Sequence, residues 1–236
     1  MSNKISLFPN TQLKCTAVDY IWQILYKINT MSKYDISAFN ELIKNRRSVL
    51  PPLYQAGKTI PDDIIIQLLR NANWAPNHKH TEPWRFTIIS GEGRNWFARL
   101  QSELYRKNTG EHWKEIKLKK LETFPLMASH IIAIGMKRHA GVINEVEEIA
   151  ATACAVQNLF LSVTAYGLAG YWSTGGITYY EEARPYFGLA SEDKLMGFFY
   201  LGYPTIDLGE GYKRGDIVDK VTHIDSDHFI PNLNPA

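Results

Sequence analysis

The sequence predicts an α+β fold in which helices pack on a mainly antiparallel sheet. Candidate helices and strands alternate only in part along the chain, which disfavours a parallel sheet built from strand–helix–strand units. The segment Glu145–Tyr166 is long and apolar enough for a core helix, whereas His130–Met136 has the length of a buried strand. We therefore expect helices and strands to form separate layers of one domain.

The first 30 residues are predicted to be an extension, and residues 31–236 to be the domain. Leu7-Phe8-Pro9 is typical of coil, and Asp19–Ile28 could form one short amphipathic helix. Met31 is an alternative start of the chain. Because no motif in residues 1–30 can be connected with a site, we expect this extension to be dispensable.

The first helix of the domain is predicted to start after Ser37 as its N-cap and to end in the polar cluster Lys44–Ser48. Three apolar residues have the helical spacing of one buried face: Phe39, Leu42 and Ile43. Pro51 and Pro52 then favour an extended backbone, since proline fixes φ and restricts the residue before it.

A second helix is predicted to begin at Pro61 and to end at Pro76. Its buried face follows the i, i+3, i+4, i+7 spacing: Ile65, Leu68, Leu69 and Ala72. The polar turn after it leads into a β-rich run that starts near Trp84 and stops at Ser90-Gly91. Because a loop between rigid elements can hold a ligand, we expect the segment Asn73–Ser90 to carry the functional site.

Further elements are predicted from the same patterns. Asn95–Lys107 has apolar residues at helical spacing, and Glu111–Glu122 is charged enough for a solvated helix. The helix Glu145–Tyr166 is apolar on most sides and is capped by Gly167. The remaining strands are Tyr171-Trp172 and Lys194–Tyr203. A helix that is apolar nearly all round belongs in a core or at a subunit interface.

Composition limits the classes of function. With 236 residues, 45% hydrophobic and 21% charged, the chain can form one sizeable core. A net charge of +2 without a basic run gives no reason to expect nucleic acid. The distant cysteines Cys15 and Cys154 favour a reducing compartment, and we expect a cytoplasmic protein. The sequence shows no apolar run of membrane length and no convincing signal peptide, so we expect no membrane partner.

Two basic motifs could bind an anion. Arg46-Arg47-Ser48 places two guanidinium groups beside a hydroxyl, which suits a phosphate. Basic residues that complement a helix dipole would give the same pattern. Lys213-Arg214, late in a polar segment, could hold an anion or be solvated.

Two further segments are candidates for a site. His78, His80 and Glu82 would share one face of an extended segment and could ligate a metal, but a hydrogen-bonding loop is favoured because no fourth ligand follows, and we expect no metal. The glycines of Tyr171–Gly176 would let backbone approach a flat ligand, although an ordinary turn has the same composition. Gly167-x-x-Gly170 is too short for a dinucleotide fingerprint, and no nucleophile elbow or Walker loop is present.

Taken together, the motifs from Tyr34 onward resemble the nitroreductase family of FMN-dependent oxidoreductases, particularly its short NAD(P)H nitroreductase-like bacterial members. The order and spacing of these motifs carry the resemblance: Arg46-Arg47-Ser48 after a helix, Ala75-Pro76-x(5)-Glu82-Pro83-Trp84 before a strand, the alanine-rich helix Ala150–Gly167, Gly170-Tyr171-Trp172, and Phe198–Pro204.

The resemblance implies a domain-intertwined homodimer with one FMN in each of two sites built from both subunits. It implies that Arg46, Arg47 and Ser48 grip the phosphate end of FMN, together with the late pair Lys213 and Arg214. It also places two groups of residues around the flavin: Trp74 and His78 on one side, and Trp172, Ser173 and Thr174 on the other. Leu50 departs from the family pattern, since many members carry a basic residue near this position.

The implied reaction is hydride transfer from NADH or NADPH through flavin N5 to an electron-poor acceptor of the nitroaromatic or quinone type. Donor and acceptor would use one pocket in turn, and no residue is identified as a proton donor. Two alternatives from other classes are a flavin-binding or storage module without turnover, and a metal-dependent hydrolase that uses His78, His80 and Glu82.

Overall fold

The computed structural model of the chain describes residues 33–207 and 213–224, and it contains a four-stranded antiparallel sheet. The strand order is β1-β2-β4-β3, and every neighbouring pair is antiparallel. The strands are β1 (Trp84–Ile89), β2 (His130–Met136), β3 (Ala169–Ser173) and β4 (Lys194–Gly202). The predicted α+β class and antiparallel sheet are confirmed. The predicted extension, residues 1–30, lies outside the described residues.

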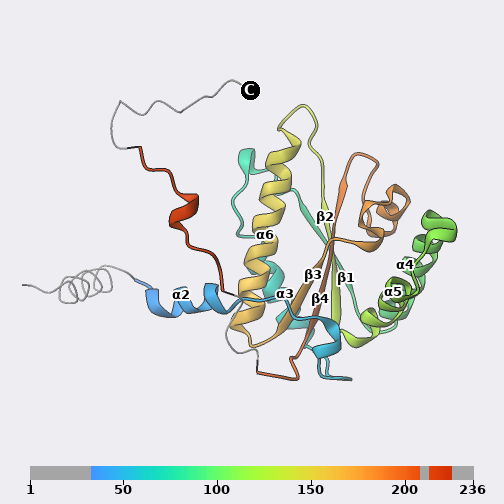
Figure 1. Cartoon of the computed structure of the whole chain (residues 1–236). Coiled ribbons are helices and arrows are strands. Elements are labelled where there is room, and N and C mark those ends of the chain that lie inside the picture. The colour runs from blue at the N-terminus through green and yellow to red at the C-terminus, as the bar shows by residue number, and fades with distance from the viewer. Residues whose placement is uncertain (1–32, 208–212, 225–236) are drawn as a thin grey trace, which may run out of the picture.

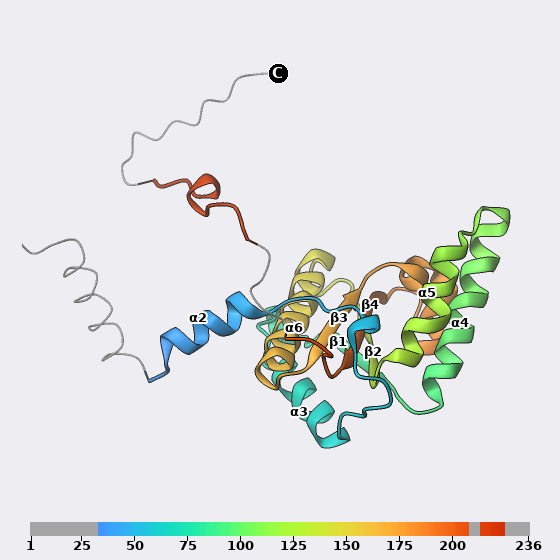
Figure 2. The ribbon, with the colours of Figure 1, turned by 60° about the horizontal axis from the view of Figure 1, so that its bottom comes forward.

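Helices cover both faces of the sheet (Figures 1 and 2). On one face, α6 (Glu145–Ala165) packs beside α3 (Asp62–Ala72). On the other face lie the paired helices α4 (Gly93–Thr109) and α5 (Glu115–Met127). A further helix, α2 (Ile36–Asn45), projects beyond the sheet near the C-terminal half of α6. Short 3-10 turns connect these elements at 51–53, 78–80, 110–112, 176–179 and 181–187, and a further one at 218–220 follows β4.

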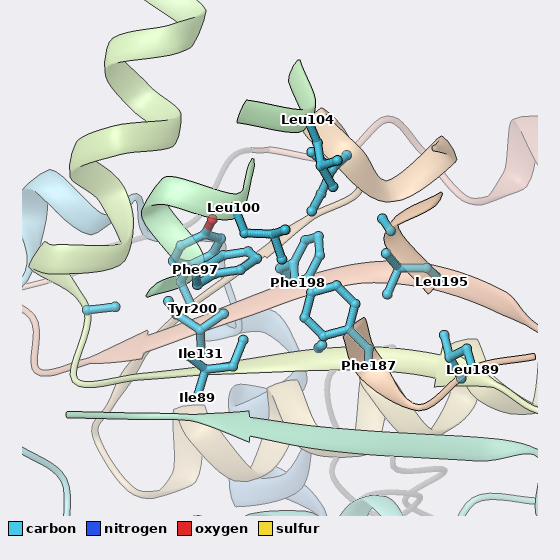
Figure 3. Close-up of a cluster of buried hydrophobic side chains, with 14 of the residues drawn as sticks. Ile89, Phe97, Leu100, Leu104, Ile131, Phe187, Leu189, Leu195, Phe198 and Tyr200 are labelled. Carbon is cyan, nitrogen blue, oxygen red and sulfur yellow. The ribbon is translucent and has the colours of Figure 1, made fainter. Parts of the chain in front are cut away.

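Two hydrophobic clusters fill the space between these layers. Side chains alternate across each strand, so Ile132 and Phe199 face α6, whereas Ile131 and Phe198 face α4. Figure 3 shows the cluster that contains Ile131 and Phe198, in which α4 residues pack against the central strands. Every residue of β2 is buried, as predicted from its unbroken apolar run.

The long helix α6 has one buried face and one open face. Its buried side chains contact the sheet, and Gly167 follows the helix with φ +66°, as predicted for a cap. By length and composition α6 could cross a membrane, so the prediction that no apolar segment reaches this length is wrong. Its burial against the sheet identifies it as a core helix. The opposite side leaves Val146 68% exposed, with Ala150 and Cys154 also open.

The predicted buried face of α2 is not covered by the described residues. Phe39 is 54% exposed and Ile43 is 44% exposed, because α2 projects beyond the sheet (Figure 2). The predicted N-cap Ser37 is also wrong: the cap is Asp35, whose carboxylate accepts a hydrogen bond of 3.0 Å from Ala38 N. The apolar stripe of α2 therefore has no complete cover within the described part of one chain.

Two other segments differ from prediction in their bounds. The charged helix predicted at 111–122 starts four residues later, as α5, and accommodates Pro125 in its last turns. Pro51 and Pro52 do not extend the chain but open a 3-10 turn, Pro51–Leu53, because proline also suits the first positions of a helical turn. The predicted helix at 61–76 is confirmed as α3, with Ile65, Leu68 and Ala72 buried.

A buried histidine links β2 to the start of α3. His130 is buried, and its Nε2 lies 3.1 Å from Asp62 Oδ1, while its Nδ1 lies 2.9 Å from Ser129 Oγ. Ser129 Oγ in turn accepts a hydrogen bond of 2.7 Å from Ile60 N. Burial lowers the pKa of His130 below its usual value, although the carboxylate of Asp62 partly opposes this shift.

We expect the free energy of unfolding to fall when the pH drops below about 6.5, the usual pKa of an unfolded histidine. In this range the unfolded chain binds the proton that folded His130 resists, so acid favours unfolding. Urea unfolding at several pH values would show that the free energy of unfolding falls less on acidification for His130→Gln than for the unsubstituted protein. His112→Gln is the matched control, because His112 is exposed. Equal pH slopes for all three proteins would contradict this role of His130.

Candidate functional site

The segment Arg46–Ser48 lies between the end of α6 and the start of β3. Val49 N donates a hydrogen bond of 2.9 Å to Gly170 O, which fixes the segment against β3. The Arg46 guanidinium lies over the ring of Phe160, 4.9 Å from its centroid. Phe160 lies in the predicted core helix Glu145–Tyr166, and in the structure it also supports a basic side chain.

Three guanidinium groups converge at this place. Partial burial, and then the positive charges of Arg214 and Arg47, lower the pKa of Arg46. Nε and Nη2 of Arg47 are shielded from solvent. The structure thus brings together the predicted residues Arg46, Arg47 and Arg214, although 168 positions separate the first from the last. Ser48 and Lys213, their neighbours in the sequence, are exposed. A cluster of like charges favours a bound anion, which would relieve their mutual repulsion.

The predicted residues Trp172, Ser173 and Thr174 lie at the other end of β3. Trp172 Nε1 donates a hydrogen bond of 3.1 Å to Met196 O, so the indole is held against β4. Gly197 permits this close packing: a Cβ at this position would lie 2.4 Å from Ser173 O. From Gly170 to Thr174 the edge strand spans about 13 Å at roughly 3.3 Å per residue. The basic cluster and the predicted flavin contacts are therefore separated by the length of β3.

Trp74 lies in the polar segment after α3, as predicted. Its side chain is 86% exposed and borders a groove formed with Arg70 and Phe86. The preceding residue, Asn73, accepts a hydrogen bond of 2.8 Å from Trp84 Nε1 through its side-chain oxygen. The backbone beneath Trp74 is thus anchored to β1, while the indole remains open to another molecule.

His78 is held at the opposite end of α6 from the basic cluster. Its Nδ1 forms a short contact with Glu147 in the first turn of α6. Lys79 Nζ donates a hydrogen bond of 2.8 Å to Val142 O, and Glu82 N donates one of 3.0 Å to Asn77 Oδ1. These contacts fix the loop on the helix end.

The backbone of this loop is strained. Three residues other than glycine have positive φ: Lys79 (53°), His80 (53°) and Glu82 (41°). Such conformations are uncommon and concentrate at functional sites. The extended segment assumed for metal ligation by His78, His80 and Glu82 is therefore wrong, because residues 78–80 form a 3-10 turn. Within residues 33–207 and 213–224, no group of three or more His, Cys, Asp or Glu side chains is placed to hold a metal ion.

A buried carboxylate near this loop was not predicted. Glu148 is buried in α6, where it accepts hydrogen bonds from Arg138 and His139 in the segment after β2. Burial alone would raise the pKa of Glu148, but the hydrogen bonds from His139 and Arg138 outweigh it and lower the pKa. The carboxylate stays charged and ties the end of β2 to the start of α6. The sequence signal that could have predicted this buried carboxylate is the position of Glu148 in a mainly apolar helix.

The two groups of predicted residues are far apart within one chain. His78 contacts Glu147 in α6, whereas Arg46 lies over Phe160 in the same helix. Along the helix axis, Glu147 and Phe160 are separated by about 20 Å, at roughly 1.5 Å per residue. A single described chain therefore brings Arg46, Arg47 and Arg214 together, but not with His78.

Comparisons with known proteins agree with this architecture. The model of the nitroreductase family matches residues 43–203. The "Putative NAD(P)H nitroreductase YdjA" of Escherichia coli strain K12 is 31% identical over 78% of this chain and 97% of its own length. The "Putative NAD(P)H nitroreductase YfhC" of Bacillus subtilis is 28% identical over 80% of this chain and 95% of its own length.

Solved structures give the same result. A nitroreductase-like family protein from Bacillus cereus is 30% identical, with a TM-score of 0.68 over 83% of this chain and 100% of its own. The FMN-dependent nitroreductase NfnB of Mycobacterium smegmatis, solved with NADPH, is 18% identical, with a TM-score of 0.63 over 80% of this chain and 99% of its own. The second likeness concerns the fold alone.

Proposed function

The chain belongs to the nitroreductase family, a family of oxidoreductases, and we propose that it is an FMN-dependent NAD(P)H oxidoreductase. Bound FMN would supply the redox chemistry, which is hydride transfer from NADH or NADPH through flavin N5 to an electron-poor acceptor of the nitroaromatic or quinone type. The chain itself supplies binding, orientation and charge.

The convergence of Arg46, Arg47 and Arg214 is the observation that supports this proposal most strongly. We assign the phosphate of FMN to this cluster, with the Ser48 hydroxyl and the Lys213 ammonium as further donors. From there, the length of β3 leads to Ser173 and Thr174, where we place the flavin ring. Trp172, fixed by its bond to Met196, would form the adjoining wall.

We further propose that the protein is a homodimer and that Trp74 and His78 reach the flavin of the partner subunit. Within one chain, His78 and Arg46 lie about 20 Å apart along α6. A two-fold axis that packs the open faces of two α6 helices antiparallel would place the first turn of one helix beside the last turns of the other. The His78 end of one subunit would then meet the Arg46 end of its partner, and each site would need both chains.

On this proposal, residues 31–236 form the FMN-binding domain and residues 1–30 are an extension of it. We assign the protein to the cytoplasm, because the separated cysteines Cys15 and Cys154 favour a reducing compartment. The small-molecule acceptor would enter the pocket after the oxidised nicotinamide leaves.

The visible absorption spectrum of the purified protein and its steady-state kinetics test the proposed function. We expect the blue absorption of bound oxidised flavin, oxidation of NADH or NADPH, and parallel double-reciprocal plots, since donor and acceptor share one pocket in turn. Bound flavin without turnover would favour a storage module instead. A colourless protein whose activity is lost to a chelator would favour a metal-dependent hydrolase.

A further inference from the structure

Tyr54 lies beneath the basic cluster and belongs to none of the predicted site motifs. Its side chain is 5% exposed. Its hydroxyl donates a hydrogen bond of 2.8 Å to Val49 O and lies 3.2 Å from Tyr200 O. Val49 directly follows Ser48, so this hydroxyl holds the backbone that carries the three residues Arg46–Ser48.

The hydroxyl of Tyr54 remains a donor at all working pH values. Burial raises its pKa far above the usual value, and the neighbouring tyrosines Tyr200 and Tyr171 raise it further. A protonated phenol can donate its one hydrogen to a carbonyl without interruption by deprotonation. The hydroxyl that contacts Val49 O therefore keeps its proton in the folded protein.

The ring of Tyr54 is itself held against the end of β4. Tyr54 forms an isolated antiparallel bridge with Pro204, and Gln55 N donates a hydrogen bond of 2.8 Å to Tyr203 O. The ring covers Gly202 so closely that a Cβ there would lie 2.4 Å from the ring atom Cδ2. Tyr54 is thus a rigid support that joins the sheet to the Arg46–Ser48 segment.

Both peptide groups of Val49 are bonded by this arrangement. Val49 N donates to Gly170 O in β3, and Val49 O accepts from Tyr54. The side chain of Val49 is also buried. With Val49 fixed at its N–H, its carbonyl and its side chain, the direction in which Arg47 and Ser48 leave the sheet is fixed as well.

We infer that Tyr54 is a positioning residue for phosphate recognition: it acts through Val49 to hold Arg46, Arg47 and Ser48 in the geometry that binds the phosphate of FMN. This inference rests on the proposed function. It predicts a selective effect, because a support beneath the phosphate-binding segment contributes to affinity for FMN but not for riboflavin, which lacks the phosphate.

The test compares both flavins on the apoprotein of Tyr54→Phe by quenching of flavin fluorescence. The substitution keeps the ring, and hence the packing on Gly202, and removes only the hydroxyl. We expect the dissociation constant for FMN to rise roughly 3- to 10-fold, the effect of one net hydrogen bond, while that for riboflavin stays unchanged. Gly202→Ala, whose Cβ would collide with the same ring, should shift the two constants in the same selective way.

Tyr200→Phe is the matched control. It removes another buried tyrosine hydroxyl of the same core, one that bonds to Gln101, and leaves the donation from Tyr54 to Val49 O in place. We expect a comparable loss of stability and an unchanged ratio of FMN to riboflavin affinity. The inference is overturned if Tyr54→Phe leaves this ratio unchanged, or if Tyr200→Phe changes it equally. If the unsubstituted protein binds neither flavin, the proposed function fails and the inference fails with it.

Discussion

The double variant Arg46→Ala/Arg47→Ala is expected to lose FMN almost completely. A charge-assisted hydrogen bond contributes roughly 1.5 to 3 kcal/mol, so two lost guanidinium groups would raise the dissociation constant by about two to four orders of magnitude. The desolvation that lowers the pKa of Arg46 strengthens this expectation, since a partly buried cation interacts more strongly with a phosphate than an exposed one does.

Dialysis followed by the visible spectrum measures this effect. The matched control is Arg99→Ala/Arg106→Ala, which removes the same two charges from exposed positions of α4. Arg106 lies 3.9 Å from Glu122 at the surface, a pair that contributes little to stability. Full retention of flavin by the Arg46/Arg47 variant, or equal loss in the control, would contradict the assignment of the phosphate.

The sheet and the helices α3 and α6 could be predicted because their burial follows local sequence patterns. The unbroken apolar run of β2 requires cover on both faces, and the spacing of Ile65, Leu68 and Ala72 in α3 defines one buried stripe. Bounds were less predictable where two residues of similar chemistry compete. Asp35 and Ser37 can both cap a helix, and only the contact with Ala38 N decides between them.

The composition of the site could be predicted from motifs, but its dimensions could not. Arg46 and Arg214 were both candidates for anion binding, and the fold brings them together. The order of the motifs does not show that His78 lies at the opposite end of α6 from Arg46. The distance between these two residues depends on how the segments that carry them pack against α6. The positive φ angles of Lys79 and His80 were also unpredictable, since residues other than glycine seldom adopt them.

Tyr54 shows a further limit of sequence patterns. Its role comes from one hydroxyl and one carbonyl, Val49 O, and a backbone acceptor leaves no signature in the residue types. Gly202 was part of a recognised motif, yet the reason for a glycine there, the covering ring of Tyr54, is visible only in three dimensions.

The open apolar surface of one chain is the main argument for a dimer. Apolar periodicity shows that a helix face needs cover but not which chain covers it. In α2, Phe39 and Ile43 remain exposed, and in α6 a stripe of Val146, Ala150 and Cys154 faces outward. The two helices are in contact, with α2 near the C-terminal half of α6 and the α6 stripe in its N-terminal half (Figure 2). Obligate dimers commonly bury 2,000 Å² or more, and these two faces are the surfaces available for it.

Ala150→Arg is therefore expected to dissociate the dimer and release FMN together, because an arginine in the α6 stripe would place a charge in an apolar interface and separate the halves of each site. For the unsubstituted protein, we expect the melting temperature to rise with protein concentration. Sedimentation velocity and the flavin spectrum, recorded on the same dilution series, measure both effects. Ala190→Arg, the same substitution at an exposed position outside α2 and α6, should leave both unchanged. A folded, flavin-loaded monomer near 27.0 kDa at sub-micromolar concentration would contradict both the dimer and the shared site.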